Sequence, residues 1–396
     1  MAVDWGLRAW GGIASAVALM AQWIFLLRWA EHAPPLVVVT SAGIAIFGAA
    51  FLLSWAAEAA QIDIPPSLSF AFLAFIAVLP EYAVDLYFAW QAGSDPTYTQ
   101  YATANMTGAN RILIGAGWPL VVLAFWWKSG SGYVALSETH TTELRFLVAA
   151  TLYSFVIPFK GTLNIFDSLI LLAIFAAYLA AAARSGVVEP ELGGPAETIG
   201  GLPTVRRRWL TTVLFAACGV TILAAAEPFA ESLLEVGRVA NIDEFILVQW
   251  VAPLASESPE FIVATLFALK LKPGDGFSTL LSSKVNQWTL LIGALPLAFV
   301  AAVGGIEPMI LDHRQAQEIM LTAAQSWFAV TVLCDLRFGI REALVLLVLF
   351  SIQLAFPHPA VRMAFVWIYL AGSVLIIALS AGHRRGMARL AGVATR

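Results

Sequence analysis

The sequence carries little charge and little cysteine. Only 12% of its 396 residues are charged and two are cysteines, whereas 60% are hydrophobic and the mean hydropathy is +0.81. Roughly 25% of the residues of an ordinary soluble domain are charged. The composition therefore excludes a soluble globular fold and indicates an all-α polytopic membrane protein that lies in a lipid bilayer.

Several chemical motifs are also missing. The five histidines are dispersed without an HExxH pattern, and no GxxxxGK[ST] sequence for binding nucleotide phosphates is present. Cys218 and Cys334 each lie inside an apolar run, so we interpret them as small core residues and not as a disulfide or metal pair. We expect no cofactor, no nucleotide and no nucleic acid as partners.

About twelve apolar segments approach the roughly 20 helical residues that cross a bilayer. They lie at residues 10–28, 36–60, 66–91, 100–127, 144–159, 163–184, 209–236, 242–270, 277–304, 317–334, 340–356 and 360–381. The first is also compatible with a signal peptide, but its length favours an uncleaved span. Residues 185–208 are rich in Gly, Pro and Glu and predict a linker between two groups of five spans.

The segment 251–270 is the costliest to bury, because Glu257 and Glu260 flank Pro259 within it. A charged side chain at the bilayer centre costs about 3 kcal/mol or more, so these carboxylates should face a cavity, a cation or a partner. Pro259 has no amide hydrogen, and we expect the helix to kink or break there. The carbonyl oxygens freed in this way are further possible ligands.

A second Pro-Glu pair, Pro80 and Glu81, lies in the opposite half of the chain, with Asp85 one helical turn later. Corresponding interrupted segments in two halves are typical of the midplane binding site of a transporter. With the N-terminus in the cytoplasm, 15 of the 22 basic residues fall on the inside and five on the outside. The termini and the linker are thus predicted to be cytoplasmic, in the inner (plasma) membrane of a prokaryote, with the halves as inverted repeats.

Each Pro-Glu segment is followed by a span that bears asparagine: ANMTGAN at 104–110, and SSKVNQW at 282–288. This arrangement resembles the membrane region of sodium/calcium exchangers, in the calcium/cation antiporter superfamily, whose two repeats have the form GTSLPE followed by GNxxGSN. The resemblance covers about residues 36–356 and implies an inverted 5+5 repeat core, here with one extra helix at each end. The predicted parts are an N-terminal helix (1–33), the first repeat (34–184), the linker (185–208), the second repeat (209–356), and a C-terminal helix with a basic tail (357–396).

The resemblance also implies a cation site at mid-membrane. It pairs the acids Glu81 and Glu260 and the asparagines Asn110 and Asn286. The complete predicted set of metal ligands is Glu81, Asn110, Ser256, Glu257, Glu260, Ser282 and Asn286. Calcium takes about 6–8 oxygen ligands, which such a set with backbone carbonyls and water can supply. The alternative is that Glu81 and Glu260 are structural acids satisfied by their neighbours.

Four further ionisable residues are candidates for proton or charge coupling: Asp85, Glu227, Glu231 and Lys284. Closely spaced carboxylates titrate as a coupled set, which allows a site to exchange protons for a metal ion. Lys284 stands where the second motif has glycine. We weigh two roles for it, a countercharge that alternates with the transported cation and a structural ion pair with Glu227 or Glu231.

The function that these patterns favour is a secondary antiporter, not an enzyme, that exchanges calcium or another cation against sodium or protons by alternating access. Ala77 and Val78 replace hydroxyl residues of the first motif and Met106 another possible hydroxyl ligand, which favours sodium/proton exchange as the nearest alternative. A transport-inactive scaffold is a third hypothesis. An intramembrane aspartyl protease is disfavoured, because its GxGD-like motif is absent. The sequence does not indicate the oligomeric state.

Overall fold

The chain forms two compact units, each built from both halves of the sequence. The computed structural model describes residues 3–29, 32–64, 78–184, 192 and 194–392. The first unit is Met1–Tyr87 with Leu179–Pro259, and the second is Phe88–Tyr178 with Glu260–Arg396. The two boundaries in the first half fall inside the helices α4 (Leu79–Gln91) and α9 (Ile165–Arg184), and the third falls inside α12 (Glu244–Leu269).

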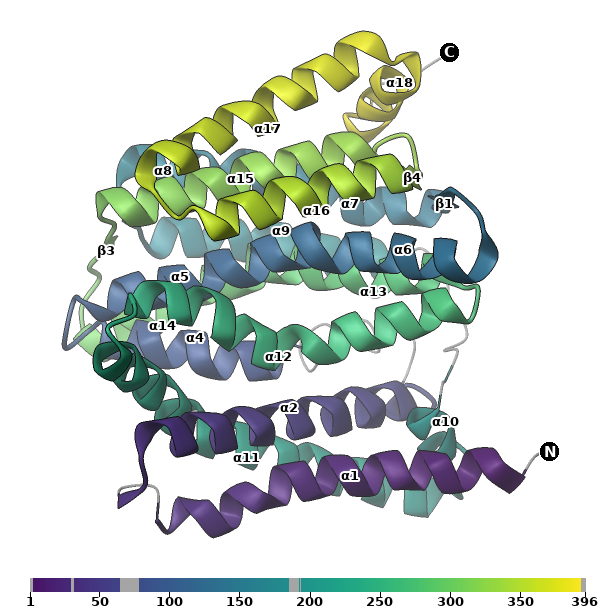
Figure 1. Cartoon of the computed structure of the whole chain (residues 1–396), viewed down its shortest axis with the longest axis vertical. Coiled ribbons are helices and arrows are strands. Elements are labelled where there is room, and N and C mark those ends of the chain that lie inside the picture. The colour runs from purple at the N-terminus through teal and green to yellow at the C-terminus, as the bar shows by residue number, and fades with distance from the viewer. Residues whose placement is uncertain (1–2, 30–31, 65–77, 185–191, 193, 393–396) are drawn as a thin grey trace. The chain divides into compact units, whose positions relative to one another are not determined.

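The first unit is a helical layer in which α2 packs against both α1 and α11, as Figure 1 shows. Its complete helices are α1 (Val3–Leu27), α2 (Pro35–Ala60), α10 (Pro195–Gly200) and α11 (Thr204–Ala240). Small residues let the helices approach closely. A Cβ atom added to Gly48 of α2 would lie 2.8 Å from the carbonyl oxygen of Ala16 of α1. Packing of these helices therefore depends on glycine and alanine along α2.

The start of α11 overlaps the end of the predicted linker (185–208). Helix α11 begins at Thr204, so the arginines at 206–208 lie in its first turns. Arg207 donates to both carboxylate oxygens of Asp63, with N–O distances of 2.7 and 2.9 Å, and Arg208 donates to the same group at 3.0 Å. The Arg207 hydrogen bonds hold the pKa of Asp63 below its usual value. This ion pair ties the start of α11 to the turn that follows α2.

Two long interrupted helices run through the second unit. The first consists of α5 (Tyr98–Ile112), η2 (Leu113–Gly117) and α6 (Trp118–Ser129), and the second of α13 (Pro273–Asn286), η4 (Gln287–Leu291) and α14 (Ile292–Val303). The segments η2 and η4 are π-helical turns. The other helices of this unit are η3 (Glu138–His140), α7 (Thr141–Ser154), α8 (Val156–Lys160), α15 (His313–Leu333), α16 (Ile340–Ala355), α17 (Pro359–Leu379) and α18 (Ala381–Leu390).

Two short antiparallel strand pairs join distant segments of the second unit at the ends of its helices. Strand β1 (Tyr133–Ala135) pairs with β4 (Arg337–Gly339), with Val134 opposite Phe338. Strand β2 (Thr162–Leu163) pairs with β3 (Met309–Ile310). Both pairs connect a turn of the first half to a turn of the second half.

Gly115 marks a close helix contact at the π-helical turn η2. A Cβ atom at this position would lie 2.3 Å from Cγ of Phe350 on α16. Because overpacking a dense core costs about 1–3 kcal/mol, we expect Gly115→Ala to lower the midpoint of thermal unfolding in detergent. Gly219→Ala is the matched control, since nothing lies within 4 Å of a Cβ at this glycine of α11. An unfolding midpoint of Gly115→Ala at or above that of the control would contradict the close packing.

Most of the expected spans coincide with helices, but the count of about twelve is not confirmed. Among the described residues, eight helices are long and apolar enough to cross a membrane. Of the remaining expected spans, α12 carries the buried acid Glu257 and α16 has only 16 residues. The span at 66–91 is represented by α4, whereas residues 65–77, including Ala77, lie outside the described part of the chain.

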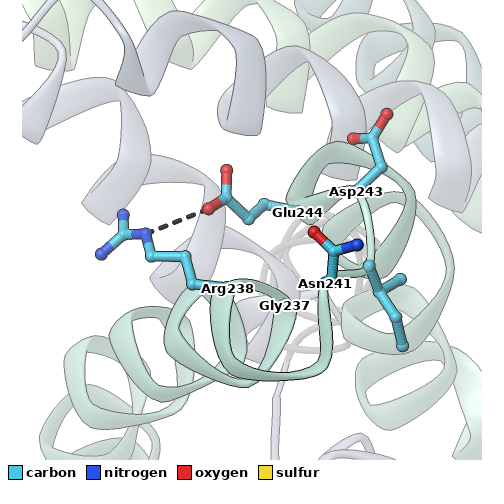
Figure 2. Close-up of a pocket in the computed structure, with 6 residues that line it drawn as sticks. Gly237, Arg238, Asn241, Asp243 and Glu244 are labelled. Atoms are coloured by element: carbon cyan, nitrogen blue, oxygen red, sulfur yellow. Dashed lines mark hydrogen bonds and ion pairs between the residues drawn. The ribbon is translucent and has the colours of Figure 1, made fainter.

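The turn between α11 and α12 lines an open polar pocket of about 310 Å³ (Figure 2). Arg238 donates to Glu244 across it at 3.0 Å, and Asp243 accepts a hydrogen bond from the amide of Phe245 at 2.9 Å. Asn241 ends α11 in the left-handed conformation, with φ at 54°. None of the residues that line this pocket belongs to the predicted cation site.

Candidate functional site

The first group of candidate residues lies on α4. Pro80 is in the first turn of this helix, where a missing amide hydrogen is tolerated. Glu81 and Asp85 follow at a spacing of four residues, so they share one helical face. Both are buried, with 1% and 0% of their surface exposed. The predicted pairing of these acids along one face is consistent with a regular α4 helix.

Helix α11 contributes one of its two candidate acids to the surroundings of α4. The hydroxyl of Tyr87 donates to Oε1 of Glu231 at 2.8 Å. Glu227, one turn earlier on α11, is exposed. The structure thus distinguishes the surroundings of two acids that the sequence grouped together, and a role of either acid in proton coupling stays a prediction.

Helix α12 corrects the expectation of a break at Pro259. The helix continues from Glu244 to Leu269 with Pro253 and Pro259 inside it. Neighbouring serines bond to carbonyls of the preceding turn: the Ser256 hydroxyl donates to Ala252 at 3.3 Å, and the Ser258 hydroxyl donates to Leu254. These hydroxyls bond to carbonyls other than that of Ala255, which is the one that loses its donor at Pro259. Helix α12 therefore stays helical through the other backbone hydrogen bonds of the helix.

Both acids of the second Pro-Glu pair therefore lie on one continuous helix. Glu257 is buried, with 2% of its surface exposed, and Ser256 is 6% exposed. Glu260 follows one turn later and is half-buried. Two carboxylates at a spacing of three residues share a helical face, so the structure retains the juxtaposition that the sequence predicts only for a regular helix.

Asn110 and Lys284 meet in the second unit, from α5 and α13 respectively. The ammonium group of Lys284 donates to Oδ1 of Asn110 at 2.6 Å and to its backbone oxygen at 3.3 Å. The amide nitrogen of Asn110 donates to the carbonyl of Met106 at 2.8 Å, which leaves Oδ1 turned toward the lysine. Both side chains have no exposed surface, and the ammonium also lies 4.4 Å from the ring centroid of Trp288.

This contact places a positive charge on an oxygen that the sequence assigned to a metal ion. An ammonium group and a metal cation compete for the same amide oxygen, since both are held there by its partial negative charge. Lys284 thus contacts a predicted ligand, and its role as a countercharge stays a prediction. The other hypothesis, an ion pair with Glu227 or Glu231, joins residues of different units and stays a prediction.

Each asparagine of the second motif is followed by a π-helical turn. Asn110 precedes η2 by three residues, and Asn286, with 1% of its surface exposed, directly precedes η4. Single π-helical turns inside α-helices occur frequently at functional sites. Helix α5 packs against η4, and α13 packs against η2, so the two turns lie close together within the second unit. The sequence analysis did not predict this feature.

Ser282, the remaining hydroxyl candidate, is half-buried on α13. Its Oγ lies 3.0 Å from the hydroxyl oxygen of Tyr178 on α9. A hydroxyl that shares a hydrogen bond with tyrosine keeps a lone pair for a cation. Ser282 therefore remains compatible with its predicted role as a ligand.

The predicted ligands are divided between the two units. Glu81, Ser256 and Glu257 lie in the first, whereas Asn110, Glu260, Ser282 and Asn286 lie in the second. Among the described residues, no group of three or more His, Cys, Asp or Glu side chains could hold a metal ion. The predicted set also relies on amide and hydroxyl oxygens, and the meeting of Glu81 with Glu260 stays a prediction.

A buried ion-pair group escaped the sequence analysis. Arg111, next to Asn110, pairs with Glu318 on α15 at 2.6 Å, and the same carboxylate pairs with Arg362 on α17 at 2.8 Å. The sequence analysis counted Arg362 only among the basic residues on the outer side of the membrane and gave it no partner, whereas just 5% of this residue is exposed in the structure. Removing one partner of such a group costs about 3–5 kcal/mol, because a charge is left buried and uncompensated. The sequence could have indicated this group through Arg111, because an arginine inside an apolar span requires an acid nearby.

Comparisons with known proteins identify the family of this chain. The family model of the sodium/calcium exchanger protein matches residues 34–184 and 210–357. The chain is similar to the crystal structure of the H+/Ca2+ exchanger CAX, with 43% identity over 98% of both chains and a TM-score of 0.93. A comparison with curated proteins gave no match.

Two more distant structures share the fold. The native structure of YfkE is 16% identical, with a TM-score of 0.63 over 88% of this chain and 98% of that chain. The sodium-calcium exchanger NCX_Mj is 15% identical, with a TM-score of 0.53 over 87% of this chain and 99% of that chain. The family and these structural neighbours are exchangers and not enzymes, which confirms the resemblance seen in the sequence. The chain therefore belongs to the sodium/calcium exchanger family, as a multi-pass transmembrane exchanger of calcium or related cations.

Proposed function

We propose that the protein is a secondary antiporter that exchanges calcium against protons. The observation that carries the proposal is the 43% identity to the H+/Ca2+ exchanger CAX, which extends over 98% of both chains. Buried oxygen ligands on α4, α5, α12 and α13 support a cation as the substrate. Such hard oxygen donors are the ligands that calcium prefers.

In the proposed mechanism, Glu81 and Glu260 supply negative charge, and Asn110, Asn286, Ser256 and Ser282 supply neutral oxygens. Asp85 and Glu257 each lie one turn from a main acid, so each pair of carboxylates titrates as a coupled set. Protons bound by these acids neutralise the site after calcium leaves. Calcium and protons thus bind the same carboxylates alternately, and this competition couples the transport of one to the transport of the other.

We also propose the arrangement in the membrane. About twelve spans form an inverted 5+5 core with one extra helix at each end, and the termini face the cytoplasm of a prokaryote. The excess of basic residues on that side supports the orientation. Alternating access then consists of gating movements around a site near the bilayer midplane.

Sodium/proton exchange on the same fold is the second candidate. The observation in its favour is Lys284, whose ammonium occupies Oδ1 of Asn110. A fixed positive charge lowers the net negative charge of a site and disfavours a divalent ion relative to a monovalent one. Sodium/calcium exchange is the third, since the family includes it.

The test is ion flux in proteoliposomes that contain the purified protein. An outward proton gradient without sodium should drive calcium uptake, and collapsing that gradient with a protonophore should stop it. Uptake driven only by a sodium gradient would indicate sodium/calcium exchange instead. Sodium uptake coupled to protons without calcium movement would support the second candidate, and no flux of any ion would favour a transport-inactive scaffold.

A further inference from the structure

Three helices of the second unit are joined by the buried group Arg111, Glu318 and Arg362. Nη2 of Arg111 lies 2.6 Å from Oε2 of Glu318, and Nε of Arg362 lies 2.8 Å from Oε1 of the same carboxylate. The three side chains are 3%, 4% and 5% exposed. Helix α15, which carries Glu318, packs against both α5 and α17. The carboxylate of Glu318 thus connects α5 to α17.

The orientation of Arg362 is defined by every part of its guanidinium group. Nη1 donates to Oε1 of Gln317 at 2.7 Å, and Nη2 donates to the carbonyl of Pro357 at 3.3 Å. Guanidinium is planar and holds its donors in a fixed fork, so these contacts specify direction as well as distance. Apolar packing between the same helices would not specify the rotation of α5 to the same degree.

A second chain of hydrogen bonds reaches α5 from the same side. Gln325 on α15 donates to the carbonyl of Arg111 at 3.2 Å. Gln353 on α16 donates to Oε1 of Gln325 at 3.2 Å and to the hydroxyl of Tyr369 on α17 at 3.1 Å. The main chain and the side chain of Arg111 are therefore both hydrogen-bonded to α15, and through α15 they are linked to α16 and α17.

Arg111 directly follows Asn110, and successive residues of an α-helix point about 100° apart. Arg111 is bound toward α15, whereas Asn110 is bound toward Lys284 on α13. A rotation of α5 that loosened one contact would therefore move the other. The ion-pair group and the amide oxygen of Asn110 are mechanically linked through one peptide unit.

We propose that Glu318 and Arg362 are positioning residues for Asn110, so that the C-terminal helix α17 takes part in forming the cation site. The ion-pair group sets the rotation of α5 and thereby the direction of Oδ1 of Asn110. This inference rests on the proposed cation exchange. It extends the transport machinery beyond the residues matched by the family model, which end at 357.

The first test compares Arg362→Met and Arg362→Lys with Arg341→Met, an exposed arginine at the start of α16. Hydrogen–deuterium exchange is measured over α5, and the KM for calcium is measured in proteoliposomes with folded protein selected by size exclusion. Arg362→Met should increase exchange in α5 and raise the KM about fivefold, with a smaller change in maximal rate. Arg362→Lys should restore part of both, and Arg341→Met should match the wild type.

A folded Arg362→Met protein with wild-type exchange in α5 and a wild-type KM would overturn the proposal. A second variant covers the case in which Arg362→Met does not fold. Replacing the whole group by apolar residues (Arg111→Met, Glu318→Leu, Arg362→Met) leaves no buried charge unpaired and should fold. The proposal predicts a raised KM in this variant, and a wild-type KM would overturn it.

Failure of the proposed function has a different signature. In that case the wild type would exchange no cation, while Arg362→Met would still increase hydrogen exchange in α5. If the wild type transports and Arg362→Met increases exchange in α5 without raising the KM, the ion-pair group only holds the helices together and the proposal is wrong.

Discussion

Calcium exchange is expected to fall by about 100-fold or more in Glu81→Gln and in Glu260→Gln, because calcium affinity depends strongly on the number of charged ligands. Glutamine keeps the size of the side chain but removes the negative charge. Glu81 is buried on α4 with 1% of its surface exposed, and Glu260 is half-buried on α12. Loss of transport without loss of folding would therefore report on charge at the site and not on packing.

The measurement is calcium uptake driven by a proton gradient, together with calorimetric calcium binding to the purified proteins. Glu235→Gln is the matched control, since Glu235 is an exposed acid on α11. Equal transport by the wild type and both variants would remove the proposed mechanism. Loss in only one variant would show that the two acids do not act as a pair.

The second large effect is expected for Lys284→Met. In the wild type, the ammonium of Lys284 donates a hydrogen bond to Oδ1 of Asn110 at 2.6 Å. Removing the ammonium frees this oxygen. We expect the KM for the transported cation to fall about tenfold, which corresponds to about 1.4 kcal/mol. The maximal rate should also fall, because the lysine no longer replaces the departing cation on the amide oxygen.

Two further variants make this result specific. Lys284→Arg keeps the charge but changes a compact ammonium into a larger planar group, so it should retain a KM nearer to the wild type. Lys270→Met removes an exposed lysine that follows α12 and should change neither constant. A KM unchanged in Lys284→Met would reduce the lysine to a structural role.

The apolar segments predicted much of the secondary structure. Span 36–60 became α2 (Pro35–Ala60), and span 360–381 became α17 (Pro359–Leu379). Span 100–127 became the interrupted helix from Tyr98 to Ser129, but its π-helical turn was not foreseen. Apolar runs and Pro-Gly punctuation act over a few residues, whereas a π-helical turn depends on how the helix packs against its neighbours.

Sequence motifs likewise identified the family, because Pro-Glu and ANMTGAN are short local patterns. They were less informative about Pro259, where a kink or a break was expected and α12 continues without a break. A proline removes one backbone hydrogen bond, here to the carbonyl of Ala255, but the other hydrogen bonds of α12 keep the helix continuous. The sequence shows the local cost of a proline but not whether the rest of the helix offsets it.

Local patterning alone thus established a multi-pass helical exchanger and the identities of its candidate ligands. The choice of partners required the folded chain. Lys284 could be assigned to a glutamate or to the site, and only packing of α13 against the segment around α5 brought it to Asn110, 174 residues away. Arg111 could neutralise any buried acid, and only the neighbouring positions of α5, α15 and α17 selected Glu318 and Arg362. A buried charge requires a partner of opposite charge or a hydrogen-bond acceptor nearby. Which residue serves as that partner depends on the packing of the helices and cannot be read from the spacing of residues along the chain.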